Sequence, residues 1–169
     1  MAMALGILTF GGPIRDVFLY DTFTGMVKPT DHDVSLKEEK ASEYFDQCKI
    51  GEDRSNWCFA SLDDVRNNMA LVDYPAERIH YIKGKVEDTL LETRPEKISL
   101  LRLDTDWYES TRFELEHLYP RLVKGGVLII DDYGHWKGAK KAVDEYFGKQ
   151  GSVFLNRIDY TGRLLVKAD

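Results

Sequence analysis

Two short apolar segments that each end in aspartates constrain the fold of this chain more than any other feature. They cover residues 98–103 and 127–130, and the residues between them, from about 110 to 124, have helical spacing. A strand, a helix and a second strand at this spacing form a βαβ unit, so the two strands should be parallel. The carboxylates at the ends of the two strands are Asp104, Asp106, Asp131 and Asp132.

These four acids should converge, because parallel neighbouring strands place their carboxyl ends at the edge where open α/β sheets bind ligands. Converging carboxylates repel one another unless a cation or protons neutralise them. Oxygen ligands suit Mg²⁺, Ca²⁺ or Mn²⁺. The alternative is that each aspartate merely caps the helix that follows it. We favour a metal site in which the candidate ligands are Asp104, Asp131 and Asp132.

Asp106 lies two residues beyond the first candidate ligand. A divalent cation there could hold a substrate hydroxyl and lower its pKa. Asp106 could then take the proton as a general base. The alternative is that Asp106 is a solvated cap for the helix that follows.

The bulk composition excludes several classes of protein. A length of 169 residues fits one domain, and a net charge of −6 argues against a general nucleic-acid binder or a protein of anionic membranes. No apolar run approaches the length of a membrane span. The two cysteines, Cys48 and Cys58, have neither metal-site spacing nor a CxxC pattern, so we expect reduced thiols in a cytoplasmic protein.

The order of elements predicts the fold class. Besides the βαβ unit, we expect strands at 16–20 and 79–83, a closing hairpin of 153–158 with 163–167, and helices at 1–10, 36–47, 61–71, 86–91 and 137–149. This order predicts an α/β protein with a Rossmann-like, mostly parallel, doubly wound sheet and an antiparallel C-terminal hairpin. We expect a single domain over residues 1–169, in which the polar stretch 22–50 is an insert or lid.

Three further residues are candidates for binding. Asp21 ends the first visible strand, where an acid in nucleotide-binding sheets hydrogen-bonds a ribose diol. It could equally be a helix cap or a turn former, and both alternatives stay open. His135 and Trp136 follow the second pair of aspartates. Their rings could line an acceptor pocket, or they could be loop residues that pack against the core.

Five segments carry a resemblance to a known family. They are YDTFTGM (20–26), HYIKGKVEDTL (80–90), LLRLDTDWYEST (100–111), the stretch 115–147 that contains GGVLIIDDY, and NRIDYTG (156–162). On these motifs the chain resembles the macrocin O-methyltransferase (TylF-type) family of class I S-adenosylmethionine-dependent methyltransferases over nearly its whole length. The resemblance implies methylation of a hydroxyl, typically on a sugar of a natural product, with S-adenosylmethionine and Mg²⁺ as cofactors.

The resemblance also implies roles for individual residues. The three candidate ligands would hold the metal and Asp106 would be the base, as the acid pattern itself indicates. Asp21 would bind the ribose of the cofactor, and Lys85 with Val86 would lie beside its adenine. The acceptor hydroxyl would attack the sulfonium methyl in line, and positioning would supply much of the rate.

One departure from the family concerns the N-terminus. The family's first strand and its glycine-rich loop precede the helix that here begins at Met1, so we expect a chain truncated at its N-terminus that lacks this strand. In the family's sheet that strand lies between the strands at 16–20 and 98–103. We therefore expect either that the remaining strands pair across the gap or that another chain fills it, with an incomplete cofactor site and poor affinity.

Two other functions compete with a methyltransferase. A signalling receiver domain also gathers acids around Mg²⁺, but there the acid pair ends an earlier strand than the single aspartate, the reverse of this chain. A non-catalytic binding or assembly module would keep the fold alone. As partners we expect a small-molecule hydroxyl acceptor and further copies of the chain in a homo-oligomer, with no nucleic acid and no membrane.

Overall fold

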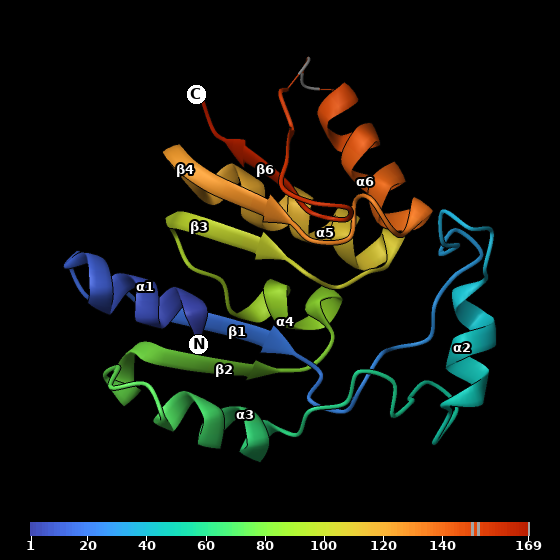
Figure 1. Ribbon diagram of the computed structural model, residues 1–169, viewed down its shortest axis with the longest axis horizontal. Helices are drawn as coiled ribbons and strands as arrows, with labels where there is room; N and C mark the ends of the chain where they lie inside the picture. The colour runs from blue at the N-terminus through green and yellow to red at the C-terminus, as the bar shows by residue number, and fades with distance from the viewer. Residues whose placement is uncertain (150, 152, 169) are drawn as a thin grey trace.

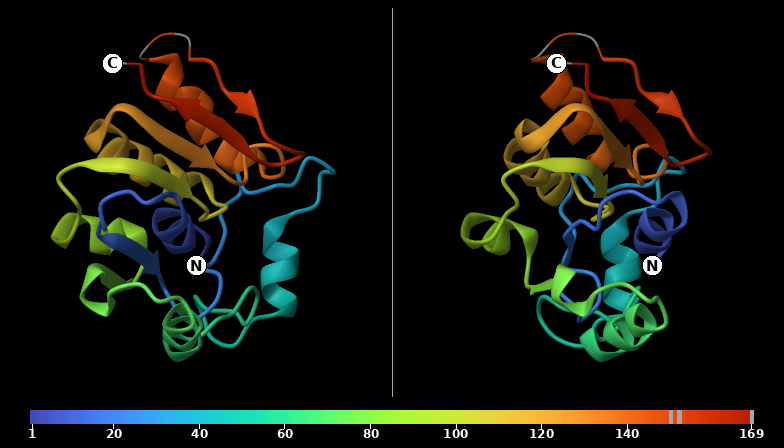
Figure 2. Two further views of the ribbon diagram at one scale, coloured as in Figure 1. Left: turned by 60° about the vertical axis from the view of Figure 1, so that its left-hand side comes forward. Right: turned by 90° about the vertical axis from the view of Figure 1, so that its left-hand side faces the viewer.

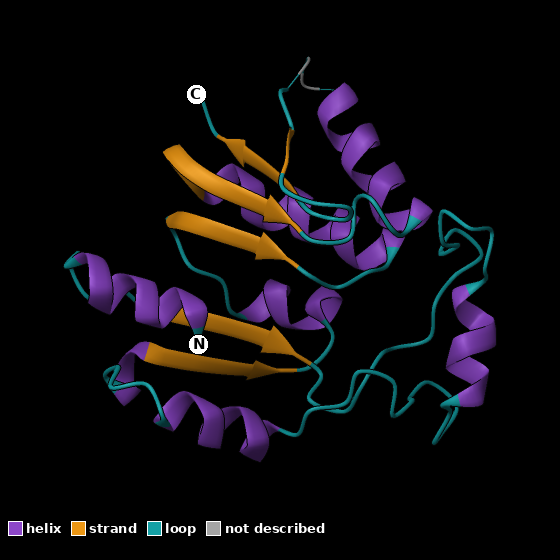
Figure 3. Cartoon of the chain, viewed as in Figure 1, coloured by secondary structure: helices purple, strands orange, loops and turns teal. Residues whose placement is uncertain are grey.

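The structure, a computed structural model, describes residues 1–149, 151 and 153–168. Helices and strands alternate along most of the chain (Figures 1 and 3). The helices are α1 (Ala2–Phe10), α2 (Ala41–Gln47), α3 (Leu62–Ala70), α4 (Val86–Glu92), α5 (Tyr108–Leu118) and α6 (Lys137–Gly148). The strands are β1 (Val17–Asp21), β2 (Ile79–Lys83), β3 (Ile98–Leu103), β4 (Leu122–Ile130), β5 (Asn156–Arg157) and β6 (Arg163–Val166).

The strands form two hydrogen-bonded sheets. β1 pairs with β2 in parallel, and the second sheet has the order β3-β4-β6-β5, in which β3 and β4 are parallel and β6 is antiparallel to both of its neighbours. The predicted α/β class, the parallel pairs and the antiparallel C-terminal hairpin are confirmed. Figure 2 shows α1 and α4 on opposite faces of the strands, as in a doubly wound fold.

The two sheets are not joined to each other by any strand pairing of the described residues. Within the described residues no ladder connects β1 to β3, and in Figure 1 the two strands run in the same direction but are set apart from each other. Of the two alternatives expected for the gap, pairing of the remaining strands is therefore not what the described residues do, and filling of the gap by another chain stays a prediction. β1 uses one edge for β2, from Val17 opposite Ile79 to Asp21 opposite Lys83, and its other edge has no strand partner in the part of the chain that the structure describes.

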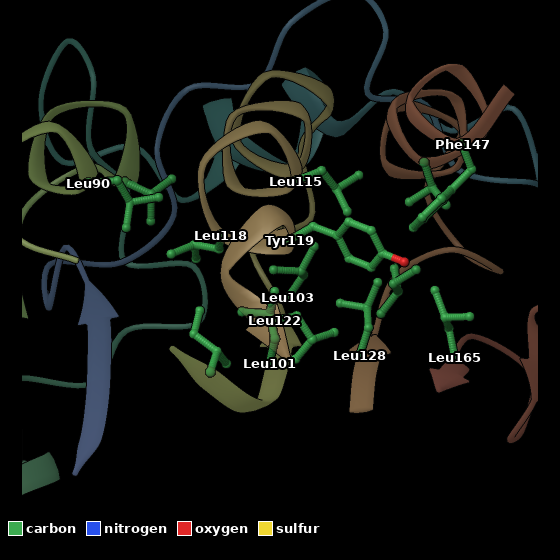
Figure 4. Close-up of a cluster of buried hydrophobic side chains, with 14 residues drawn as sticks. Leu90, Leu101, Leu103, Leu115, Leu118, Tyr119, Leu122, Leu128, Phe147 and Leu165 are labelled. Carbon is green, nitrogen blue, oxygen red and sulfur yellow. The ribbon is translucent and has the colours of Figure 1, made fainter. Parts of the chain in front are cut away.

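Each sheet has a hydrophobic core of its own. The larger core lies between β3, β4 and β6 and the helices α4, α5 and α6 (Figure 4), and Leu90, Leu115 and Leu128 are fully buried in it. The smaller core joins α1 and α3 to β1 and β2 around Ala4 and Met69. Burial of such aliphatic side chains is the main favourable term in folding.

The boundaries of several elements differ from the prediction. α2 begins at Ala41 instead of residue 36, because the chain turns back at Glu38 (φ 67°) and Val34 forms a bridge with Lys40. The predicted helix at 110–124 starts earlier, at Tyr108, and ends at Leu118, where a single 3-10 turn leads into β4. In the hairpin, only Asn156–Arg157 of the first predicted segment, 153–158, is strand.

The helix predicted at 61–71 is confirmed together with its cap. The Ser61 hydroxyl accepts from the Asp64 N–H at 3.1 Å, and the Asp64 carboxylate accepts from the Ser61 N–H in return. None of the described helices has both the length and the apolar character that a membrane span requires.

Candidate active site

The ends of β3 and β4 bring the predicted acids to one edge of the sheet. Leu103 lies opposite Ile130 in the parallel register, and the Asp131 N–H extends the ladder by donating to the Leu103 carbonyl at 3.0 Å. Asp104 and Asp131 are therefore the first residues beyond two paired strand ends. The convergence that the sequence predicts rests on this register.

Three carboxylates are close enough to share one ion. Oxygens of Asp104, Asp131 and Asp132 all lie within 4.8 Å of one another. Opposite ligands in an octahedral Mg²⁺ site are about 4.2 Å apart, and those around Ca²⁺ about 4.8 Å apart. The three oxygens thus fit a hard divalent cation, with a small side-chain adjustment for the smaller Mg²⁺.

Two of these carboxylates have pKa values well above the usual value for aspartate. Burial raises the pKa of Asp104 to about 7, helped by the neighbouring Asp131. Burial also raises the pKa of Asp132 to about 9, helped by repulsion from the negative charge of Asp106. Crowded acids hold protons when no other charge balances them, and a bound cation would displace those protons.

Sequence reasoning missed one member of the cluster, Arg102. Its guanidinium pairs with Asp104 through Nη1 and with Asp131 through Nη2, the latter at 3.0 Å. Alternation along β3 could have revealed it: Leu101 and Leu103 are buried on one face, so residue 102 must share the other face with Asp104.

Asp106 occupies a strained turn behind the cluster. It has φ 65°, in the left-handed region that few residues other than glycine adopt. Its Oδ1 accepts a hydrogen bond from Nε1 of Trp136 at 3.0 Å, so it does not cap the following helix in solvent. Burial raises the pKa of Asp106, and hydrogen bonds from Asp132 and Trp136 offset part of the rise.

The predicted cofactor residues meet in one cavity. Asp21 from the end of β1, and Lys85 and Val86 from the start of α4, line a cavity that also reaches Asp104. Oδ1 of Asp21 accepts from the Phe23 N–H at 2.6 Å, so this carboxylate also forms the turn after β1. The cavity therefore adjoins the acid cluster, as a cofactor site beside a metal would.

Comparison with known proteins decides the family. The family model for the macrocin O-methyltransferases (TylF) matches residues 1–167. The chain belongs to this family. The predicted family is thus confirmed over almost the whole sequence.

Relatives of known name are natural-product methyltransferases. A demethyldecarbamoylnovobiocin O-methyltransferase of Streptomyces niveus is 33% identical over 80% of this chain and 48% of its own length. A tetracenomycin-C rhamnosyl 4'-O-methyltransferase of Streptomyces olivaceus is 33% identical over 90% of this chain and 55% of its own. The mycinamicin III 3''-O-methyltransferase of Micromonospora griseorubida is 31% identical over 81% and 51%. The chain spans about half the length of these relatives.

Solved structures agree on the fold. The O-methyltransferase NovP superposes with a TM-score of 0.80 at 28% identity, covering 99% of this chain and 66% of NovP. The calicheamicin methyltransferase CalS11 superposes with a TM-score of 0.70 over the same shares, and at 21% identity this likeness concerns the fold alone.

In this macrocin O-methyltransferase family member the two predicted acceptor residues differ in exposure. Trp136 is 5% exposed and packs against Trp107 with ring centroids 5.2 Å apart, which matches the loop-packing alternative. His135 is half-buried, and its Nδ1 lies 3.3 Å from the Tyr160 hydroxyl. Contact between these residues and a substrate stays a prediction.

Proposed function

We propose that this chain is the S-adenosylmethionine-dependent, Mg²⁺-assisted methyl-transferring part of an O-methyltransferase that acts on a hydroxyl of a sugar or other natural product. The observation that carries the proposal is the triad of carboxylate oxygens within 4.8 Å of one another. The nearby cavity with Asp21, Lys85 and Val86 supports it, because it offers the cofactor a place beside the triad. The names of the relatives support the sugar or natural-product acceptor.

In this proposal the chain's own residues divide the work. Asp104, Asp131 and Asp132 hold the cation, which supplies Lewis-acid polarisation of the acceptor hydroxyl. Asp21 orients the ribose of the cofactor, while Lys85 and Val86 flank its adenine. Asp106 contacts the reacting atoms as the base.

Proton transfer falls to Asp106. The acceptor oxygen forms a bond to the methyl carbon, the carbon–sulfur bond breaks with its electron pair going to sulfur, and the hydroxyl proton goes to the Asp106 carboxylate. A base works best when its pKa lies near the working pH, and burial moves the pKa of Asp106 upwards in that direction.

Binding and turnover measurements test this proposal together. Titration with Mn²⁺ or Mg²⁺ should show one site that Asp104→Asn abolishes and that Asp63→Asn, an exposed acid on α3, leaves unchanged. Asp106→Asn should keep metal binding and lose methyl transfer from S-adenosylmethionine to glycosylated natural products, followed by mass spectrometry. Equal metal binding by the wild type and Asp104→Asn would refute the proposed site.

A second candidate is a fold-only assembly module that does not bind the cofactor. The observation that favours it is the break between β1 and β3, since each strand leaves one edge without a strand partner in the described residues. Under this alternative Asp104→Asn would leave assembly unaffected, and calorimetry would detect no micromolar binding of S-adenosylmethionine. A homo-oligomeric state and a cytoplasmic location stay predictions from the sequence.

A further inference from the structure

The cap of α5 comes from a distant part of the chain. α5 starts at Tyr108, two residues after Asp106, and its N-cap residue Trp107 makes no side-chain capping bond. Instead, Oδ1 of Asp33 accepts the Tyr108 N–H at 2.8 Å, across 75 positions in the sequence. An aspartate at this position satisfies one of the unpaired N–H groups of the first turn.

Asp33 is built into its surroundings. Asp33 is 1% exposed. The oxygen that does not cap α5, Oδ2, accepts from the Thr30 N–H at 2.7 Å and from the Thr30 hydroxyl at 2.8 Å. A buried carboxylate is tolerated only when such hydrogen bonds replace water. Two of the three donors are therefore within the insert and one is at the start of α5, so the side chain ties the insert to that helix through the Tyr108 N–H.

The first turn of α6 closes over the same carboxylate. A Cβ atom on Gly138 would lie 2.1 Å from Oδ1 of Asp33, so only glycine leaves room for it. Asp33 thus sits where the insert meets the beginnings of α5 and α6. These two helices follow the loops that carry Asp106 and Trp136 respectively.

Main-chain groups of the insert are also hydrogen-bonded to both loops. The carbonyl of Val27 accepts from the Trp107 indole at 3.0 Å, and the carbonyl of Val34 accepts from the Lys137 N–H at 2.8 Å. The Leu36 N–H donates to the His135 carbonyl at 2.9 Å. The insert is therefore part of the wall of the site in this structure.

The strained turn at Asp106 needs such support. A non-glycine residue with φ 65° is unfavourable and persists when the surrounding contacts over-determine it. Here the side chain of Asp106 is held by Trp136, and the backbone two residues later is held by Asp33. Loss of either contact leaves the turn free to relax.

We propose that Asp33 is a positioning residue: by capping α5 from the insert, it fixes the turn that aims the Asp106 carboxylate. The catalytic meaning of this role rests on the proposed function, in which Asp106 is the base. The positioning of Asp106 by Asp33 does not rest on that function, because the Trp136–Asp106 hydrogen bond reports on the position of Asp106 without any substrate.

The test uses the indole N–H signal of Trp136 in a ¹⁵N-labelled protein, assigned with Trp136→Phe. In Asp33→Asn one acceptor oxygen becomes an NH₂ donor, which faces either the Tyr108 N–H or the two Thr30 donors, so hydrogen bonds are lost at one of these places. The variant should therefore shift the Trp136 signal and speed exchange of that proton with solvent on the order of tenfold. Asp31→Asn, an exposed acid in the same loop, should leave the signal in place. An unchanged Trp136 signal in folded Asp33→Asn overturns the proposal.

A milder variant decides the matter if Asp33→Asn does not fold. Thr30→Val removes one of the three donors at an exposed residue and should move the Trp136 signal in the same direction by a smaller amount. No movement would overturn the proposal.

Kinetics separate this proposal from the proposed function. Where Asp33→Asn shifts the indole signal, it should also lower kcat at least tenfold, with the acceptor KM and Mn²⁺ affinity kept within twofold. A shifted signal with unchanged kcat would uphold the positioning of Asp106 and reject its role as the base.

Discussion

Nη2 of Arg102 lies 3.0 Å from Oδ2 of Asp131, so a side chain from β3 reaches the end of the neighbouring strand β4. The same guanidinium pairs with Asp104. Two of the three candidate metal ligands thus already share a positive charge supplied by the protein. A cation that binds there competes with Arg102 for carboxylate oxygens, although the arginine is exposed enough to be displaced into solvent.

Removal of this competitor should strengthen metal binding. We expect Arg102→Leu to raise the affinity for Mn²⁺ on the order of fivefold, because a half-exposed ion pair contributes about 1 kcal/mol. Isothermal titration calorimetry measures the change, and Arg66→Leu on α3 is the matched control. A fall in affinity would mean that Arg102 orients the ligands instead of competing with the metal.

Metal binding should depend on pH in a defined direction. The pKa of Asp104 is raised to about 7 and that of Asp132 to about 9, so near neutral pH protons compete with the metal for both carboxylates. The apparent affinity should rise steadily between pH 6 and pH 9, with release of protons. Calorimetry in buffers of different ionisation enthalpy counts these protons, and a flat affinity over this range would contradict the expectation.

A buried glutamate near the acid cluster should limit stability at high pH. Glu114 on α5 is 5% exposed, accepts from the Thr105 hydroxyl at 2.9 Å, and has its pKa raised by burial to about 8. Between the unfolded pKa of about 4.5 and this value, the folded state keeps a proton that the unfolded state has lost. The free energy of unfolding therefore falls as the pH rises through this window.

Glu114→Gln should remove that loss of stability. Glutamine can still accept from Thr105 but carries no charge, so the free energy of unfolding at pH 9 should exceed that of the wild type on the order of 4 kcal/mol. At pH 5 the two proteins should differ little. Urea unfolding at both pH values measures the effect, and the exposed Glu116→Gln is the control. Equal stability at pH 9 would show that Glu114 is ionised at little cost.

Local sequence patterns predict the features of this protein that depend on residues close together in the chain or on the pairing of neighbouring strands. The convergence of the acids after β3 and β4 was predictable because two parallel strands end at the same edge of a sheet. The capping box was predictable because Ser61 and Asp64 are only three residues apart in the sequence. Arg102 was missed, although the alternation of β3 contains the signal.

Other features depend on contacts that no local pattern encodes. The bond from Tyr108 to Asp33 joins residues 75 positions apart, so sequence spacing cannot reveal it. Trp136 is buried in a cluster that includes Ala41, with Met26 and Val27 packed against it, whereas the sequence of 22–50 shows only a polar stretch. Likewise the early start of β4 depends on pairing of Leu122 with Ile98, a long-range contact.

The break between the two sheets leads to a last prediction, on hydrogen exchange. In β1 and β3, the amides that point away from β2 and β4 respectively have no ladder partner in the described residues, so they should exchange with solvent quickly. The matched control is the part of β4 from Val127 to Ile130, which is paired with β3 on one side and β6 on the other, and its amides should be protected. Protection of every amide in β1 and β3 would contradict this expectation. If that protection also disappeared on dilution, a second copy of the chain would be the partner that covers these edges.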